Sequence, residues 1–170
     1  SAACYQSKAS VILNNVSKIS DMSVENTIRL ASALQWDDKD KLIVGFLNAG
    51  DRQISTAQLL SLADAAYQAK NTIRMKYLRK LTDLNPSNIV TIQQVLSWDD
   101  KDTLGLQGVE MLTRATSAEL AQIASNGYQK KGDIVLKGAK LISSLTASEL
   151  TSLVQAAEIG RASCRERVSS

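Results

Sequence analysis

The chain has 170 residues, of which 44% are hydrophobic and 22% are charged, and its formal net charge is +3. It contains no apolar run of about 18 residues, which excludes a transmembrane helix within it. It contains no histidine, which excludes Ser-His and Cys-His catalytic arrangements within it. Because only 4% of its residues are aromatic, each ring can be followed individually.

An aromatic residue followed three positions later by lysine recurs along the whole chain. The pairs are Tyr5/Lys8, Trp36/Lys39, Tyr67/Lys70, Trp98/Lys101 and Tyr128/Lys131, and the aromatic residues are spaced by 31, 31, 31 and 30 positions. A double period runs through the same markers, because each of these Tyr residues precedes Gln, whereas both Trp residues open the string Trp-Asp-Asp-Lys-Asp. A fixed period of this length indicates a repeat architecture.

The first helix of each unit is predicted to begin 12 or 13 residues before its aromatic residue. Capping-box pairs mark three of these starts, and a cap residue alone or a cap followed by proline marks two more: Ser55 with Gln58, Thr116 with Glu119, Thr146 with Glu149, then Ser23, and Asn85 before Pro86. Apolar residues follow each start at helical spacing, as at Leu59, Leu62 and Ala63. The aromatic residue is predicted to close this helix.

A polar turn and a second helix are predicted to complete each unit. Their predicted caps are Asp40, Asn71, Asp102 and Asp133. Aliphatic residues then form two rows, the first made of Val11, Leu42, Ile73, Leu104 and Ile134, and the second of Val16, Leu47, Leu78, Val109 and Ala139. No segment alternates strictly between apolar and polar residues, so no strand is predicted.

These features predict an all-α array of two-helix hairpins of about 31 residues, an α-solenoid without a β-sheet, over residues 1–157. Helices of about 12 residues are too short to be stable alone, so each hairpin is expected to bury its apolar side against its neighbours. The plan resembles tetratricopeptide-type and related helical-hairpin repeats. Because the signature positions of that family are absent and the period is shorter, the resemblance implies no functional residues. Neither end carries a polar capping repeat, so we expect a chain truncated at both ends.

The C-terminal segment 158–170 is interpreted as an artefact. Ten consecutive residues, 159–168, match the in-frame translation of a widely used sequencing adapter, and Glu158 can share that match. Residues 159–170 contribute a net charge of +2 through three Arg residues and one Glu, so the remaining chain carries +1. Excluding the tail also removes Cys164, which leaves Cys4 without a disulfide partner.

The repeated aromatic residues have two interpretations. We expect each ring to be buried in the seam between neighbouring hairpins, where it removes about 150–250 Å² from water. The alternative is a ladder of rings that stack on a ligand. The repeated lysines can be interpreted as a stripe that tracks phosphates, but the adjacent Asp residues and the small net charge oppose nucleic-acid binding. Local pairing of these lysines with carboxylates, or with the rings, is expected instead.

Metal and catalytic chemistry are not expected. The Asp-Asp-Lys-Asp strings lack the spacing of a calcium-binding loop, and acidic residues at a helix start are explained by its dipole. No glycine-rich phosphate loop is present, and no cofactor is predicted. Cys4 is interpreted as a small core residue, and its alternative role is the lipid anchor of a bacterial lipoprotein.

The predicted function is therefore a non-enzymatic scaffold that binds a protein or peptide along one face. This prediction rests on analogy with other helical repeats. The alternatives are an envelope-anchored or secreted bacterial structural lipoprotein in which the array is a spacer, and an enzyme whose catalytic domain lies outside this sequence.

Overall fold

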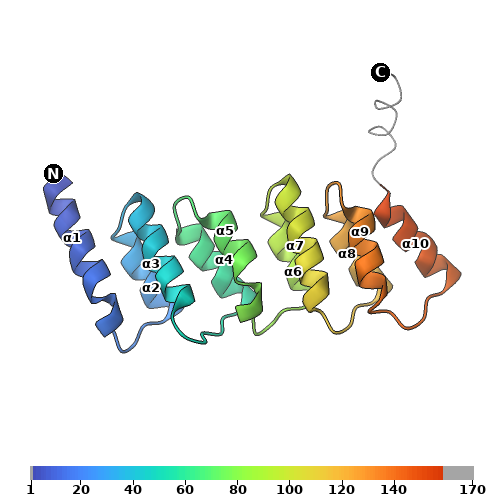
Figure 1. Cartoon of the computed structure of the whole chain (residues 1–170), viewed down its shortest axis with the longest axis horizontal. Helices are drawn as coiled ribbons and strands as arrows, with labels where there is room; N and C mark the ends of the chain where they lie inside the picture. The colour runs from blue at the N-terminus through green and yellow to red at the C-terminus, as the bar shows by residue number, and fades with distance from the viewer. Residues whose placement is uncertain (1, 159–170) are drawn as a thin grey trace, which may run out of the picture. The chain divides into compact units, whose positions relative to one another are not determined.

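The computed structural model describes residues 2–158, and these residues form an all-α protein. This confirms the predicted fold class. The described helices are α1 (Ala2–Asn15), α2 (Val24–Ser32), α3 (Trp36–Asn48), α4 (Thr56–Ala65), α5 (Lys70–Lys76), α6 (Pro86–Gln94), α7 (Trp98–Met111), α8 (Ser117–Ser125), α9 (Lys131–Ala139) and α10 (Ala147–Ala157) (Figure 1). Short 3₁₀ turns follow α1 and α5. Within residues 2–158 the only extended pairing is an isolated bridge between Ile54 and Leu81. The segment interpreted as an artefact lies outside the described residues, apart from Glu158.

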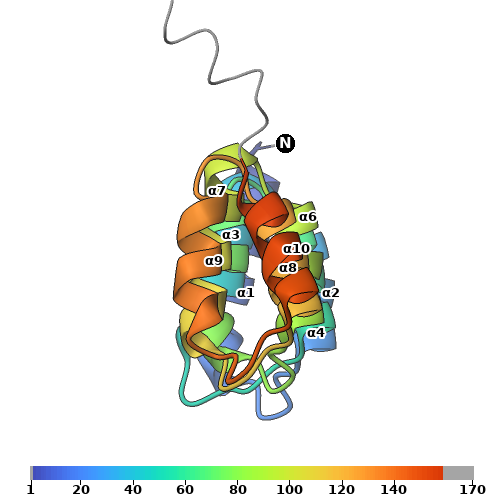
Figure 2. The same cartoon turned by 90° about the vertical axis from the view of Figure 1, so that its right-hand side faces the viewer.

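The chain divides between Thr82 and Asp83 into two compact units. In unit 1, helix α2 packs against α3 and α4, α4 packs against α5, and α1 contacts α3. In unit 2, α6 packs against α7 and α8, α8 against α9 and α10, and α7 and α10 both contact α9. The end-on view in Figure 2 shows α9 beside α10. In unit 2, α6, α8 and α10 therefore form one row of contacting helices, and α7 and α9 form a second row beside it.

The starts of the first helices were predicted correctly. The side chains of Ser23, Ser55, Asn85, Thr116 and Thr146 each accept a hydrogen bond from the backbone N–H three residues later. Full capping boxes form at Ser55, Thr116 and Thr146, and Pro86 is the first residue of α6. These contacts satisfy backbone donors that lack an intrahelical partner, and they depend only on local sequence.

The predicted starts of the second helices were wrong. Helices α3 and α7 begin at Trp36 and Trp98, so Asp40 and Asp102 lie inside them. Helices α5 and α9 begin at Lys70 and Lys131, so Asn71 and Asp133 lie within their first turns. The carboxylates of Asp40 and Asp102 bind the backbone of another helical hairpin instead of capping their own helices.

The core follows the predicted aliphatic rows. Leu42, Ile73, Leu104 and Ile134 of the first row are at most 2% exposed, and Leu47, Leu78 and Val109 of the second row are also buried. Three residues of the two rows are exceptions, because Val11 is 64% exposed and Val16 and Ala139 are only partly buried. Gly108 of α7 lies close to a side chain of α6. A Cβ added there would lie 2.7 Å from Ile89, so a larger residue would force the Ile89 side chain to shift.

Candidate functional site

The repeated aromatic rings lie at the protein surface and not in the seams between hairpins. Trp36 is 62% exposed and Trp98 is 70% exposed, while Tyr67 and Tyr128 are also exposed and Tyr5 is partly buried. The prediction that each ring fills a seam was therefore wrong. The physical reason is that Trp36 and Trp98 are the first residues of α3 and α7, six positions before the first buried apolar residues of these helices, Leu42 and Leu104.

Two pairs of these rings meet edge to face. The centroids of Tyr5 and Trp36 in unit 1 are 6.2 Å apart with an interplanar angle of 69°. The centroids of Trp98 and Tyr128 in unit 2 are 5.1 Å apart with an angle of 62°. Such T-shaped pairs contribute about 0.5–1.5 kcal/mol beyond the area that they bury. Each pair thus fixes a tryptophan ring in one orientation while most of its surface remains in contact with solvent.

The backbone next to the aromatic residues is held by aspartate carboxylates from a preceding second helix. Oδ1 of Asp40 accepts from the N–H of Tyr67 at 2.7 Å, and Oδ2 accepts from those of Gln68 and Ala69 at 3.0 and 3.1 Å. Asp102 repeats the arrangement with Tyr128, Gln129 and Lys130, at 2.6, 2.9 and 3.2 Å. We call these two arrangements the aspartate clamps. They explain why the last Asp of the Trp-Asp-Asp-Lys-Asp string precedes a Tyr-Gln unit.

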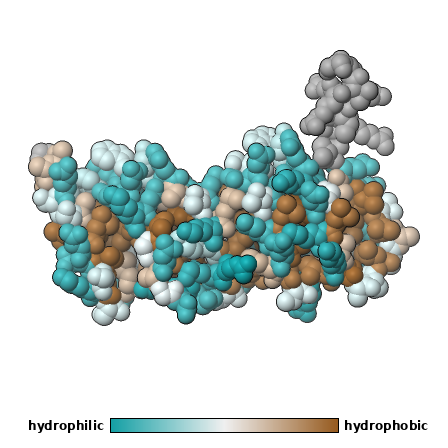
Figure 3. Space-filling view, viewed as in Figure 1, coloured by the Kyte–Doolittle hydropathy of each residue, from teal (hydrophilic) through white to brown (hydrophobic). Residues whose placement is uncertain are grey.

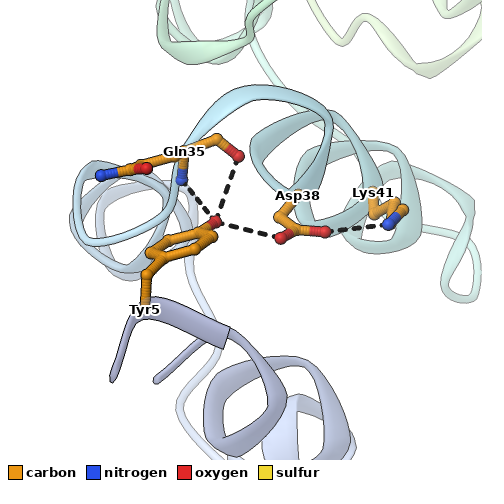
Figure 4. Close-up of polar contacts among 4 residues, drawn as sticks. All are labelled: Tyr5, Gln35, Asp38 and Lys41. Carbon is orange, nitrogen blue, oxygen red and sulfur yellow. Dashed lines mark hydrogen bonds and ion pairs between the residues drawn. The ribbon is translucent and has the colours of Figure 1, made fainter. Parts of the chain in front are cut away.

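A tyrosine side chain completes the start of α3. The hydroxyl of Tyr5 on α1 accepts a hydrogen bond from the N–H of Gln35 at 2.8 Å and lies 3.0 Å from Oδ2 of Asp38 (Figure 4). The charged carboxylate is the stronger acceptor for the hydroxyl proton. A hydrogen bond from Lys41, followed by that from Tyr5, lowers the pKa of Asp38 below its ordinary value. Tyr5 therefore links α1 to the same turn that presents Trp36.

The repeated lysines do not form the predicted local ion pairs. Ion pairs in the described part of the chain join Lys41 to Asp38, Arg74 to Asp64, and Lys137 to Glu110. Lys8 and Lys70 are exposed, whereas Lys39, Lys101 and Lys131 are partly buried. The cation–π contacts of residues 2–158 involve Arg52 with Phe46 and Lys76 with Tyr77. The structure thus places the lysine of each marker near the surface without assigning it a binding partner.

The described residues offer little for metal or nucleophilic chemistry. Residues 2–158 contain no group of three His, Cys, Asp or Glu side chains arranged to hold a metal ion. Both oxygens of Asp40 and of Asp102 are already occupied by backbone donors. Cys4 is an exposed free thiol on α1 and not the predicted core residue. Over the same residues, no helix combines the length and apolarity required to cross a bilayer.

A hollow of about 700 Å³ lies in unit 2 between the start of α6, the end of α7 and the start of α8. Its lining includes Pro86, Met111, Arg114, Thr116 and Glu119. Thr116 and Glu119 bind each other's backbone in the capping box of α8, at 2.8 and 3.2 Å. Because these polar groups already bind the backbone at the start of α8, the hollow is a weaker candidate for a functional site than the aromatic pairs.

Comparison of the chain with protein-family models, with curated proteins and with solved structures gives no match. The class of protein is therefore defined by the fold alone. It is an all-α protein, compatible with a helical-repeat organisation. The candidate site is the set of exposed aromatic residues. The sequence pattern identified these residues, but they were predicted to be buried in the core.

Proposed function

We propose that this chain is a non-enzymatic binding scaffold that recognises peptide segments through its exposed aromatic pairs. The observation that carries the proposal is the exposure of Trp36 and Trp98, at 62% and 70%, while each ring is held edge to face against a tyrosine. Large aromatic side chains kept in solvent leave apolar area uncovered, and such rings are enriched among the residues that dominate binding energy. The aspartate clamps support the proposal because one of them fixes the backbone of Tyr128, the partner of Trp98.

The charges beside the rings favour a basic partner. Asp37 and Asp99 directly follow the two tryptophans and are exposed. A cation placed over a tryptophan face gains about 0.5–2 kcal/mol, and neighbouring carboxylates attract the same cation. The peptide that fits this chemistry therefore combines Arg or Lys with an apolar residue that packs on the ring. Each aromatic pair is proposed to act as a separate recognition element.

Selection from a random-peptide display library on the full chain, followed by fluorescence titration, tests this proposal. Trp36 and Trp98 are the only tryptophans in the sequence, so their emission reports directly on the proposed site. We expect the selected peptides to be rich in Arg or Lys and to change this emission on binding. Trp98→Ala and Trp36→Ala are each expected to weaken binding of the selected peptides at least about tenfold.

Leu136→Ala is the matched control, because Leu136 on α9 is similarly exposed, at 72%, and belongs to neither ring pair. It is expected to leave peptide affinity unchanged. Equal affinity of the selected peptides for the chain and for a Trp36→Ala/Trp98→Ala double variant would show that the rings are not the binding site. Circular dichroism of each variant separates loss of binding from loss of fold.

A further inference from the structure

In unit 1, two of the loops that join successive hairpins pair with each other. Ile54, which directly precedes the cap of α4, and Leu81, which follows the turn after α5, form a backbone bridge. The N–H of Ile54 donates to the C=O of Lys80 at 2.9 Å, and the N–H of Thr82 donates to the C=O of Ile54 at 3.0 Å. The side chains of Ile54 and Leu81 are both buried. Backbone pairing therefore closes the gap between these two loops.

The equivalent loops of unit 2 do not pair. Leu84 directly precedes the cap of α6, as Ile54 precedes that of α4. Leu112 lies four positions before the cap of α8, as Leu81 does before that of α6. In the part of the chain that the structure describes, no backbone hydrogen bond joins Leu84 to residues 111–113, and both leucines are partly exposed. The backbone of Leu84 thus lacks the partners that the backbone of Ile54 has.

The hollow of about 700 Å³ lies between these two loops of unit 2, and both Leu84 and Leu112 line it. Pro86, Met111 and Ala115 add apolar surface to its lining. Figure 3 shows hydrophobic surface over the lower end of α7, next to the hollow. Its volume falls within the range of about 300–1,000 Å³ that is typical of ligand sites. Apolar walls beside backbone groups without a partner are what an extended peptide uses when it pairs with a protein as an added strand.

Two charged side chains line the hollow, and one of them is available to a partner. Glu119 is engaged at the start of α8, where its Oε2 accepts from the N–H of Thr116 at 2.8 Å. Arg114 is exposed, and none of the ion pairs within residues 2–158 includes it. A guanidinium group binds a carboxylate through two parallel hydrogen bonds. The available charge therefore favours a partner with an acidic residue.

We propose that this hollow binds an extended peptide that alternates aliphatic and acidic residues, and that the peptide backbone pairs with the loops before α6 and α8. Successive side chains of an extended peptide point to opposite faces. Aliphatic side chains then enter the hollow while an acidic side chain reaches Arg114. Main-chain hydrogen bonds supply affinity, and the contact with Arg114 selects the charge of the peptide. The site is separate from the aromatic pairs, for which a basic peptide is proposed.

Nuclear magnetic resonance titration of the ¹⁵N-labelled full chain tests this proposal. The probe is the pentapeptide Leu-Asp-Leu-Asp-Leu, acetylated and amidated at its ends. We expect the amide signals of Leu84 and Thr113 to shift and to saturate below about 1 mM peptide. Two further peptides are expected to bind at least about tenfold more weakly. One is the same peptide N-methylated at its central Leu, which lacks a backbone donor, and the other is Leu-Lys-Leu-Lys-Leu, which carries the opposite charge.

Arg114→Glu is expected to weaken binding of Leu-Asp-Leu-Asp-Leu at least about tenfold. Lys140→Glu is the matched control, because it reverses an exposed charge of unit 2 outside the lining of the hollow, and it is expected to leave this affinity unchanged. Circular dichroism of both variants separates loss of binding from loss of fold.

The absence of any saturable shift at about 1 mM peptide would overturn the proposal. So would equal affinity for all three peptides, or undiminished binding by a folded Arg114→Glu variant. The Trp36→Ala/Trp98→Ala double variant leaves the hollow unchanged and is expected to bind Leu-Asp-Leu-Asp-Leu as the parent chain does. Binding in the hollow and binding at the aromatic pairs can therefore fail independently.

Discussion

The buried carboxylate of Asp102 accepts a 2.6 Å hydrogen bond from the backbone N–H of Tyr128, 26 residues further along the chain. Two further backbone donors, from Gln129 and Lys130, complete this clamp. The contact joins the interior of α7 to the turn that separates α8 from α9. One side chain thereby fixes the place where the first helix of a hairpin ends and the orientation of the ring that follows it.

Asp102→Asn is expected to destabilise the protein by about 2–4 kcal/mol, because an amide offers one acceptor oxygen where the carboxylate uses two and carries the charge. Urea unfolding followed by circular dichroism measures the change. Asp99→Asn removes a carboxylate from the same string at an exposed position and is expected to change stability by less than about 0.5 kcal/mol. Equal losses of stability from the two substitutions would contradict a stabilising role for the aspartate clamp of Asp102.

Tyr5→Phe is expected to cost about 0.5–1.5 kcal/mol near neutral pH, because it removes the hydroxyl that contacts Gln35 and Asp38. The effect depends on pH. Since the folded-state pKa of Asp38 is lowered from 3.8, its contribution to stability is present above that value and is lost as pH falls through the folded-state pKa. The difference between parent and variant should therefore narrow in acid.

Chemical unfolding of Tyr5→Phe between pH 7 and pH 3 measures this difference. Tyr67→Phe is the control, because the Tyr67 side chain is exposed and only its backbone N–H is bound by Asp40. A constant difference at every pH would show that the hydroxyl does not interact with the Asp38 carboxylate.

Trp98→Ala is expected to cost about 1 kcal/mol, because the substitution removes one edge-to-face pair but little buried area. A tryptophan that filled a seam would cost about 3–5 kcal/mol. Leu104→Ala, on the core side of the same helix, is expected to cost about 2–5 kcal/mol because Leu104 is fully buried. Denaturant unfolding of both variants measures the two losses of stability. A loss for Trp98→Ala well below that for Leu104→Ala would place the Trp98 ring on the surface, and equal losses would place it in the core.

Gly108→Ala is expected to be destabilising by about 1–3 kcal/mol, because the added methyl group would overlap Ile89, which is fully buried. Gly45→Ala on α3 has no neighbouring atom within 4 Å and is expected to be stabilising by about 0.5–1 kcal/mol through helix propensity. Thermal unfolding of the two variants should therefore shift in opposite directions. A stabilising Gly108→Ala would mean that α6 and α7 separate readily.

The sequence by itself determined the helix class, the repeat period, the starts of the first helices and most of the buried rows. These features depend on residues within one turn of each other, as in the capping box of Thr116 and Glu119, or on apolar spacing along one helix. Their physical cause is local, so one segment is enough to predict them.

The tertiary structure decided where the second helices start and where the rings lie. Asp40 resembles a cap in the sequence, but its carboxylate binds backbone donors 27 to 29 residues away. Tyr5, Gln6 and Ser7 occupy the same register as Tyr67, Gln68 and Ala69, yet they lie within α1, whereas the later residues form a turn. A carboxylate that reaches across two helices competes with intrahelical hydrogen bonds, and only the packed structure shows which acceptor the backbone uses.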